Sequence, residues 1–82
     1  MQTILHYLYF PKEKIAVDIA LRLTKLGFIT TTRLGADNLN WLVFAQHKID
    51  ISDETIQSIR HFMEEICWDN KGEYDGWEIV YR

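Results

Sequence analysis

The residues of this chain that could catalyse a reaction or bind a metal are few and widely spaced. His6 and His47 lie in two segments that we predict to be neighbouring strands, and Asp75 and Glu78 lie close together near the C-terminus. Histidine and carboxylate side chains are zinc ligands, so these four residues form one candidate metal or enzyme site. They lack the tight spacing of a zinc motif, so we interpret the two histidines as structural or interface residues.

Asp75 and Glu78 are also candidates for a general acid and base pair. Side chains three residues apart on a regular strand point to opposite faces of the sheet, which would separate the two carboxyl groups. Gly76 lies between them and would change this parity only by forming a β-bulge. An acidic strand in which Gly76 permits close backbone approach is the simpler interpretation.

A nucleophilic enzyme is not indicated. Cys67 is the one cysteine of the chain and lies on the apolar stripe of a predicted helix, whereas His61 lies six residues away and off that stripe. No serine stands in a glycine elbow, and neither a phosphate-binding glycine loop nor a dinucleotide fingerprint is present. We therefore expect a core cysteine, no cofactor and no enzymatic activity.

Composition and charge narrow the class of protein further. The chain has 82 residues with 48% apolar and 26% charged residues, which is typical of one globular domain spanning 1–82. No apolar run reaches the ~18 residues needed to span a bilayer, and a lone cysteine suits a reducing compartment, so we expect a cytoplasmic protein. Residues 1–48 carry a net charge of +3 and residues 49–82 carry −6. The acidic half favours basic partners and opposes direct nucleic-acid binding.

The pattern of apolar residues predicts six elements in the order β-α-β-β-α-β. Pro11 suits the first turn of a helix, Gly27 suits the residue after its end, and Ser52 suits the N-cap of the second helix. Strands are expected at 3–10, 28–34, 40–47 and 73–81, and helices at 11–26 and 53–70. This order predicts an α+β, ferredoxin-like two-layer sandwich, in which a four-stranded antiparallel sheet of order 4-1-3-2 carries two helices on one face.

Both faces of this sheet are expected to be apolar. The simplest pairing places His6 opposite Phe44 and Glu78. One face would then carry Leu5, Tyr7, Tyr9, Trp41, Val43, Ala45, Trp77 and Ile79, and the other Ile4, His6, Leu8, Phe10, Leu42, Phe44, Tyr74 and Glu78. Two helices cover only one face, so the other is predicted to bind a protein, either a second copy or another partner. The alternative is that bulky side chains and loops shield this apolar patch.

An RNA-binding platform is a weaker alternative. Tyr7, Tyr9, Trp41 and Phe44 could stack bases as the aromatic residues of RNA-recognition modules do. The basic and glycine-containing signature of those modules is missing, and the acidic balance opposes the RNA backbone.

Three segments resemble the regulator of ribonuclease activity B family, the ribonuclease E inhibitor domain. They are HYLYFP at 6–11, WLVFA at 41–45 and EYDGWE at 73–78, of which YDGW at 74–77 is the most specific. The resemblance covers nearly the whole chain and implies a fold similar to the one predicted above. It also implies a non-catalytic protein that binds ribonuclease E away from the nuclease centre and alters RNA turnover.

Three functional hypotheses follow from the residues and the resemblance together. The first is a ribonuclease regulator, the second is a small homodimeric interaction module with another client, and the third is a small hydrolase or metal enzyme. For the first two, the candidate interface residues are His6, Leu8, Phe10, Trp41, Phe44, His47, Tyr74, Asp75, Trp77 and Glu78. A protein partner, a homodimer through the open sheet face and no membrane contact are expected.

Overall fold

Two helices and four strands follow one another in the predicted order β-α-β-β-α-β. The computed structural model describes residues 1–80. The elements are β1 (Gln2–Phe10), α1 (Glu13–Lys25), β2 (Ile29–Leu34), β3 (Trp41–Ile49), α2 (Asp53–Asp69) and β4 (Glu73–Val80). Helix α1 begins two residues later than predicted, because Pro11 and Lys12 lead into it in extended or bent conformations. Tyr81, the predicted end of the last strand, lies outside the described residues.

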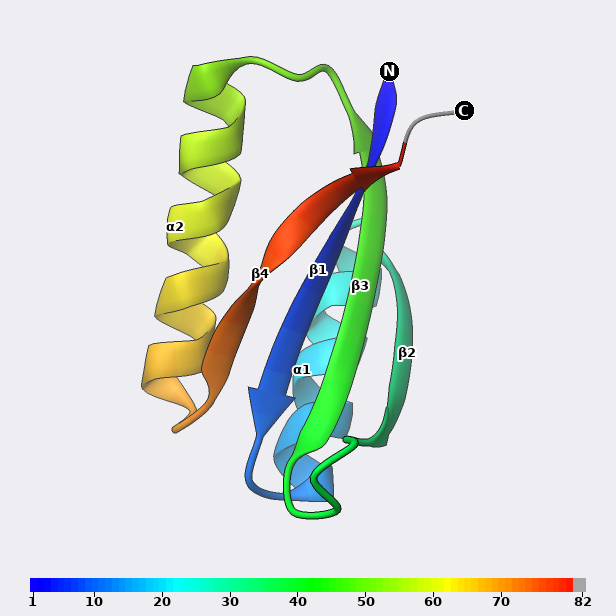
Figure 1. Cartoon of the computed structure of the whole chain (residues 1–82), viewed down its shortest axis with the longest axis vertical. Coiled ribbons are helices and arrows are strands. Elements are labelled where there is room, and N and C mark those ends of the chain that lie inside the picture. The colour runs from blue at the N-terminus through cyan, green and yellow to red at the C-terminus, as the bar shows by residue number, and fades with distance from the viewer. Residues whose placement is uncertain (81–82) are drawn as a thin grey trace.

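The sheet is antiparallel throughout, with strand order β2-β3-β1-β4 (Figure 1). This confirms the predicted ferredoxin-like α+β sandwich. Helix α1 packs mainly against β2 and β3, and α2 packs against β4 and β1. The two helices therefore divide one face of the sheet between them and leave the other face uncovered.

The core lies between the helices and one face of β1 and β3. Alternate residues of β1 are fully buried, from Ile4 to Phe10. Leu8 and Phe10 belong to one cluster of buried apolar residues that includes Val43 and Ala45 of β3, Ala16, Ile19 and Leu23 of α1, and Met63, Ile66 and Cys67 of α2. Each large apolar side chain buried here stabilises the fold by about 1.5–3 kcal/mol.

The helix ends are formed by local backbone and side-chain contacts. Ser52 Oγ accepts a hydrogen bond from the Thr55 amide at 3.1 Å, which confirms the predicted N-cap of α2. Gly27 has φ +103° and ends α1 in a Schellman motif, in which the Phe28 amide bonds the Leu23 carbonyl at 3.0 Å. The predicted C′ glycine is thereby confirmed.

Gly72 serves a different purpose from Gly27. At the end of α2 the left-handed residue is Lys71, with φ 60°, and Gly72 follows it. A Cβ at Gly72 would lie 2.5 Å from the Tyr9 carbonyl oxygen and 2.6 Å from the Phe10 ring. Gly72 is therefore required by the close approach of β1, and Lys71 makes the turn that ends the helix.

The predicted register of β3 was wrong by one residue. His6 pairs with Ala45 of β3 and with Trp77 of β4, and Phe44 lies opposite Tyr7. Trp41, Val43, Ala45 and His47 consequently face the helices, together with Ile4, His6, Leu8 and Phe10. Strand β3 is apolar on both faces for most of its length, so its hydrophobic pattern does not specify which side is buried.

The uncovered surface of the sheet, called the open face below, is apolar at its centre and charged at its edges. By register it carries Thr3, Leu5, Tyr7 and Tyr9 of β1, Leu42, Phe44, Gln46 and Lys48 of β3, Ile29, Thr31 and Arg33 of β2, and Glu73, Asp75, Glu78 and Val80 of β4. The prediction of a wholly apolar face is corrected to this mixed one.

A β-bulge at Gly76 determines which way β4 presents its side chains. The register of β4 against β1 shifts between His6 and Leu8, and Gly76 has φ +100°. Tyr74 and Trp77, three residues apart, both lie on the helix side as a result. The prediction that placed Trp77 with Tyr7 and Tyr9, and Glu78 with His6, was therefore wrong. The interpretation of Gly76 as a point of close backbone approach was also wrong, because no atom lies within 4 Å of a Cβ built there.

Gly72→Ala should destabilise the protein by about 3 kcal/mol or more, because the added methyl group would overlap backbone and a buried ring. Gly27→Ala is the comparison variant, since the φ of Gly27, +103°, is unfavourable for alanine whereas Gly72 has no positive φ, and no atom lies within 4 Å of the new methyl group at Gly27. We expect a smaller loss there, about 1–2 kcal/mol. Urea unfolding at pH 7 measures both, and equal losses would contradict the role assigned to Gly72.

Candidate functional site

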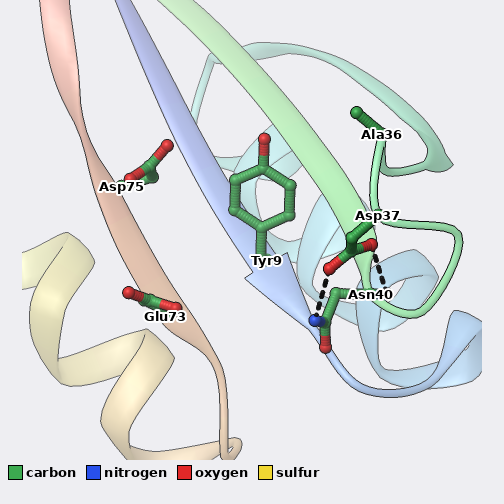
Figure 2. A pocket seen from close by; sticks show the side chains of 6 residues that line it. All are labelled: Tyr9, Ala36, Asp37, Asn40, Glu73 and Asp75. Atoms are coloured by element: carbon green, nitrogen blue, oxygen red, sulfur yellow. Dashed lines mark hydrogen bonds between the residues drawn. The ribbon is translucent and has the colours of Figure 1, made fainter.

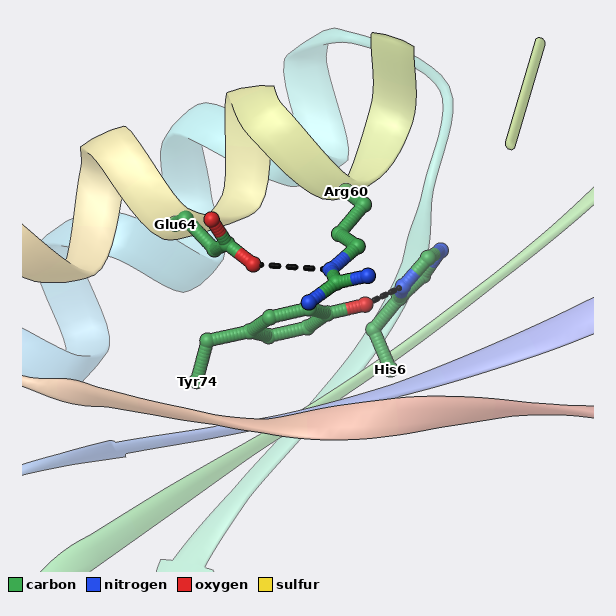
Figure 3. A network of polar contacts seen from close by, with 4 residues as sticks. All are labelled: His6, Arg60, Glu64 and Tyr74. Atoms are coloured by element: carbon green, nitrogen blue, oxygen red, sulfur yellow. Dashed lines mark hydrogen bonds and ion pairs between the residues drawn. The ribbon is translucent and has the colours of Figure 1, made fainter. Parts of the chain in front are cut away.

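The two predicted histidines meet beneath the helices. His6 is 1% exposed, and its Nε2 lies 3.0 Å from Nε2 of His47. Its Nδ1 lies 2.9 Å from the Tyr74 hydroxyl, on the side of the sheet covered by α2 (Figure 3). Each contact needs one proton, so a neutral His6 ring can donate one hydrogen bond and accept the other. Tyr74, His6 and His47 thus form a buried polar chain across three strands.

Burial holds this chain in its neutral form. Desolvation, reinforced by repulsion from His47, lowers the pKa of His6 to about 4. Desolvation also lowers the pKa of His47 and raises that of Tyr74. The Phe28 ring stacks on His47 with centroids 4.4 Å apart and meets His6 edge-on at 6.1 Å. These surroundings are typical of a core cluster whose polar groups are hydrogen-bonded to one another.

The carboxylates proposed as partners of these histidines lie elsewhere. Asp75 and Glu78 belong to the open face, on the opposite side of the sheet from His6. Within residues 1–80, no three His, Cys, Asp or Glu side chains gather closely enough to hold a metal ion. The candidate metal or hydrolase site is therefore not assembled in this structure.

The remaining candidate nucleophile is buried in the core. Cys67 is 2% exposed, and burial raises the pKa of its thiol to about 12. His61, the base considered for it, is exposed and pairs with Glu65 on the surface of α2 at 2.9 Å. The core cysteine that the sequence indicates is confirmed.

Protonation of His6 should destabilise the fold in acid. Its pKa is about 4 in the folded protein and 6.5 when unperturbed, so its neutral form favours folding fully above pH 6.5. That stability is lost as the pH falls from 6.5 towards 4, by up to about 3 kcal/mol. The free energy of unfolding should fall less steeply over this range in His6→Gln than in the exposed control His61→Gln. Equal slopes in the two variants, measured by urea titration, would contradict this assignment.

The open face brings aromatic and acidic side chains together. The Tyr7 hydroxyl donates a short hydrogen bond to Glu78 Oε1, and this bond raises the pKa of Tyr7. The Tyr7 ring also meets Phe44 edge-on with centroids 5.3 Å apart. Three of the four aromatic residues considered for base stacking, Tyr7, Tyr9 and Phe44, share this face, whereas Trp41 lies on the helix side.

At one end of the open face, acidic side chains surround a hollow of about 300 Å³. Its lining consists of Tyr9, Ala36, Asp37, Asn40, Glu73 and Asp75 (Figure 2). Asp37 is already engaged, because it accepts bonds from the amides of Leu39 and Asn40 and from the Asn40 side chain. These bonds lower its pKa. The group closes the β2–β3 loop and adds negative charge beside β4.

The outer surface of α2 carries an exposed tryptophan that sequence reasoning missed. Trp68 is 85% exposed, and it follows Glu64 and Glu65 by one helical turn and precedes Asp69. We considered only the buried stripe of this helix from its sequence. The available signal was a tryptophan lying off that stripe, next to Cys67. Large exposed aromatic residues in a charged setting are common anchors of protein interfaces.

Tertiary packing turns the charge asymmetry of the sequence into two sides of the molecule. Helix α2 packs against β4, and α1 packs against β2. The acidic side therefore consists of α2 and β4, including Glu64, Glu65, Asp69, Glu73, Asp75 and Glu78, with Trp68 on the same side. Helix α1 and β2, which carry Lys14, Arg22, Lys25 and Arg33, lie on the other side of the fold (Figure 1).

The predicted interface residues fall into three groups. His6, Leu8 and Phe10 are buried in the core, so they offer no surface to a partner in this structure. Trp41, His47, Tyr74 and Trp77 are half-buried on the helix side. Phe44, Asp75 and Glu78 lie on the open face and remain interface candidates.

A family comparison now gives these surfaces a context. The family model for regulator of ribonuclease activity B matches residues 1–79. The chain belongs to this family. Members of a regulatory family act on another macromolecule. This agrees with a fold in which the candidate catalytic side chains are buried or lie far from one another, while charged and aromatic side chains are exposed on the surface. The resemblance seen in the sequence is confirmed.

Other comparisons are informative about the fold alone. The solution structure of the SecDF periplasmic domain P4 matches with a TM-score of 0.64 and 12% sequence identity, over 99% of this chain and 89% of that chain. No curated protein matches the chain. No helix in residues 1–80 is long and apolar enough to cross a membrane.

Proposed function

We propose that this member of the regulator of ribonuclease activity B family is a non-catalytic, cytoplasmic protein that binds a ribonuclease of the ribonuclease E type, or the RNA-degradation assembly around it, and thereby modulates RNA turnover. The observation that carries the proposal is the family match over residues 1–79. A regulatory role is supported by the burial of His6 and Cys67 in the core and by the position of Asp75 and Glu78 on the opposite face of the sheet from His6.

The acidic side is the surface that we propose for this partner. Nucleases and their scaffold segments carry basic residues that bind RNA, and such residues are attracted to carboxylates through long-range steering. Glu65, Asp69 and the carboxylates of β4 supply that charge. Trp68 supplies a large apolar side chain that loses its exposed surface on binding. The same charges repel RNA, so the proposed partner is protein and not nucleic acid.

Trp68→Ala should weaken binding of the ribonuclease by about 30-fold, the loss typical of a tryptophan hot spot worth about 2 kcal/mol. Glu65→Lys should weaken it less and reduce its dependence on salt. Isothermal titration calorimetry with a purified ribonuclease E-type enzyme, and separately with its catalytic and scaffold parts, measures these effects.

Leu21→Ala is the matched control for Trp68→Ala. Leu21 is 57% exposed but lies on α1, away from the acidic side. Its removal should leave binding unchanged. A ribonuclease that does not bind the wild-type protein at all would overturn the proposed function, whereas binding that is insensitive to Trp68 and Glu65 would overturn only the surface proposed for it.

A second candidate function is a homodimeric interaction module with an unrelated client. The open face favours it, because aromatic residues lie at the centre of an uncovered sheet. A pull-down from host lysate that recovers another protein reproducibly, and no component of RNA degradation, would support this alternative over ribonuclease regulation.

A further inference from the structure

The charged residues of the open face follow an ordered pattern from one strand to the next. One row runs from Glu73 on β4 through Tyr9 and Leu42 to Arg33 on β2. Both end residues are exposed, whereas Leu42 is only 3% exposed. Three strand spacings of about 4.8 Å place the acidic and basic ends roughly 14 Å apart, too far to pair within one chain.

The next two rows continue the apolar centre. Tyr7 and Phe44 are direct neighbours on β1 and β3, with Thr31 beyond them on β2. The following row runs from Glu78 through Leu5 and Gln46 to Ile29. The face is therefore negative along β4 and apolar at the centre of β1 and β3, with polar Gln46 and Lys48 further along β3 and the positive charge of Arg33 on β2. Such a pattern is complementary to itself.

We propose that a second copy of this chain covers the open face, packed sheet against sheet about a two-fold axis that runs parallel to the strands between β1 and β3. This rotation exchanges β1 with β3 and β4 with β2 while keeping each row at its own level. Glu73 of each copy then lies over Arg33 of the other, and Tyr7 lies over Phe44. Two ion pairs flank an aromatic centre, as expected of an isologous interface.

The charges also select this axis over the other in-plane axis. A two-fold axis perpendicular to the strands, passing through the row of Tyr7, would place β4 over β4. Glu73 of one copy would then lie over Glu78 of the other, so carboxylates would oppose carboxylates on both sides. Like charges brought together in this way weaken an interface and exclude an arrangement that is otherwise allowed.

The size of the open face suits this occupant. Strand β1 has nine residues and the sheet has four strands, so the face covers roughly 20 by 30 Å. This is of the same order as the ~800 Å² that each partner buries in a stable interface. Sheets packed in this way lie about 10 Å apart, which leaves room for two layers of aromatic side chains. The outer face of α2, with Trp68, stays exposed in the dimer.

Charge exchange tests the proposal. Wild-type protein should sediment with twice the chain mass of 9.8 kDa at micromolar concentration. Arg33→Glu and Glu73→Arg should each raise the dimer dissociation constant at least 10-fold, because each places like charges together at two positions. The double variant should dimerise again. An equimolar mixture of the two single variants should also dimerise, because both of its ion pairs are restored between unlike chains.

Surface variants outside the open face are the controls. Lys14→Glu on α1 and Glu65→Arg on α2 change charge by the same amounts and should leave the dimer intact. Phe44→Glu should give a folded monomer, with folding checked by circular dichroism. A wild-type protein that is monomeric up to 100 µM would overturn the proposal, and so would a dimer that survives Phe44→Glu. Single variants that fail to rescue each other would overturn the proposed axis. None of these measurements needs a ribonuclease, so they stand apart from the test of the proposed function.

Discussion

The bulge at Gly76 is the local constraint on which the arrangement of surfaces depends. A regular strand would send Tyr74 and Trp77 to opposite faces, whereas the positive φ of Gly76 brings both to the helix side. The Tyr74 hydroxyl can then reach His6. On the other face the same shift leaves Glu73, Asp75 and Glu78 together. One left-handed glycine thus completes the buried polar chain and also gathers the carboxylates of the open face.

The buried chain of Tyr74, His6 and His47 shows how a small domain accommodates polar groups in its core. Every buried side-chain nitrogen and oxygen within residues 1–80 has a hydrogen-bond partner. A satisfied network costs little, but a slipped strand would leave ring nitrogens or the phenol unpaired at a cost of about 1–3 kcal/mol each. The chain therefore favours the observed register of β1 with β3 and β4. Its two histidines contribute to structural specificity, and the carboxylates of the open face lie on the opposite side of the sheet from them.

The order of the strands in the sheet separates the acidic part of the molecule from the basic part. Because β4 and β2 are the two edges of the sheet, each helix packs over a different edge. The acidic C-terminal half becomes one side and much of the basic N-terminal half becomes the other. The outer face of α2, with Trp68, lies apart from the open face, whereas the carboxylates of β4 belong to both the acidic side and the open face, so a client bound to β4 would compete with a second copy.

Much of this protein could be predicted from its sequence because the relevant signals are local. Ser52 and Gly27 mark helix ends through contacts within a few residues, and the period of the apolar residues distinguishes helix from strand. The order of the elements, the sandwich fold, the core position of Cys67, the charge asymmetry and the family motif at 74–77 all follow from such signals. The possibility of a bulge at Gly76 was visible, since glycine tolerates the required φ.

Tertiary structure alone decided which face each strand presents. Strand β3 is apolar on both sides, so a shift of one residue leaves its local pattern almost unchanged but exchanges Phe44 with Ala45. Packing against α1 and the hydrogen bonds of His6 resolve that ambiguity through contacts between residues far apart in the sequence. The exposure of Trp68 depends in the same way on how α2 sits on the sheet. The sequence by itself determined the secondary structure and the fold, and long-range packing determined which side chains are exposed to a partner.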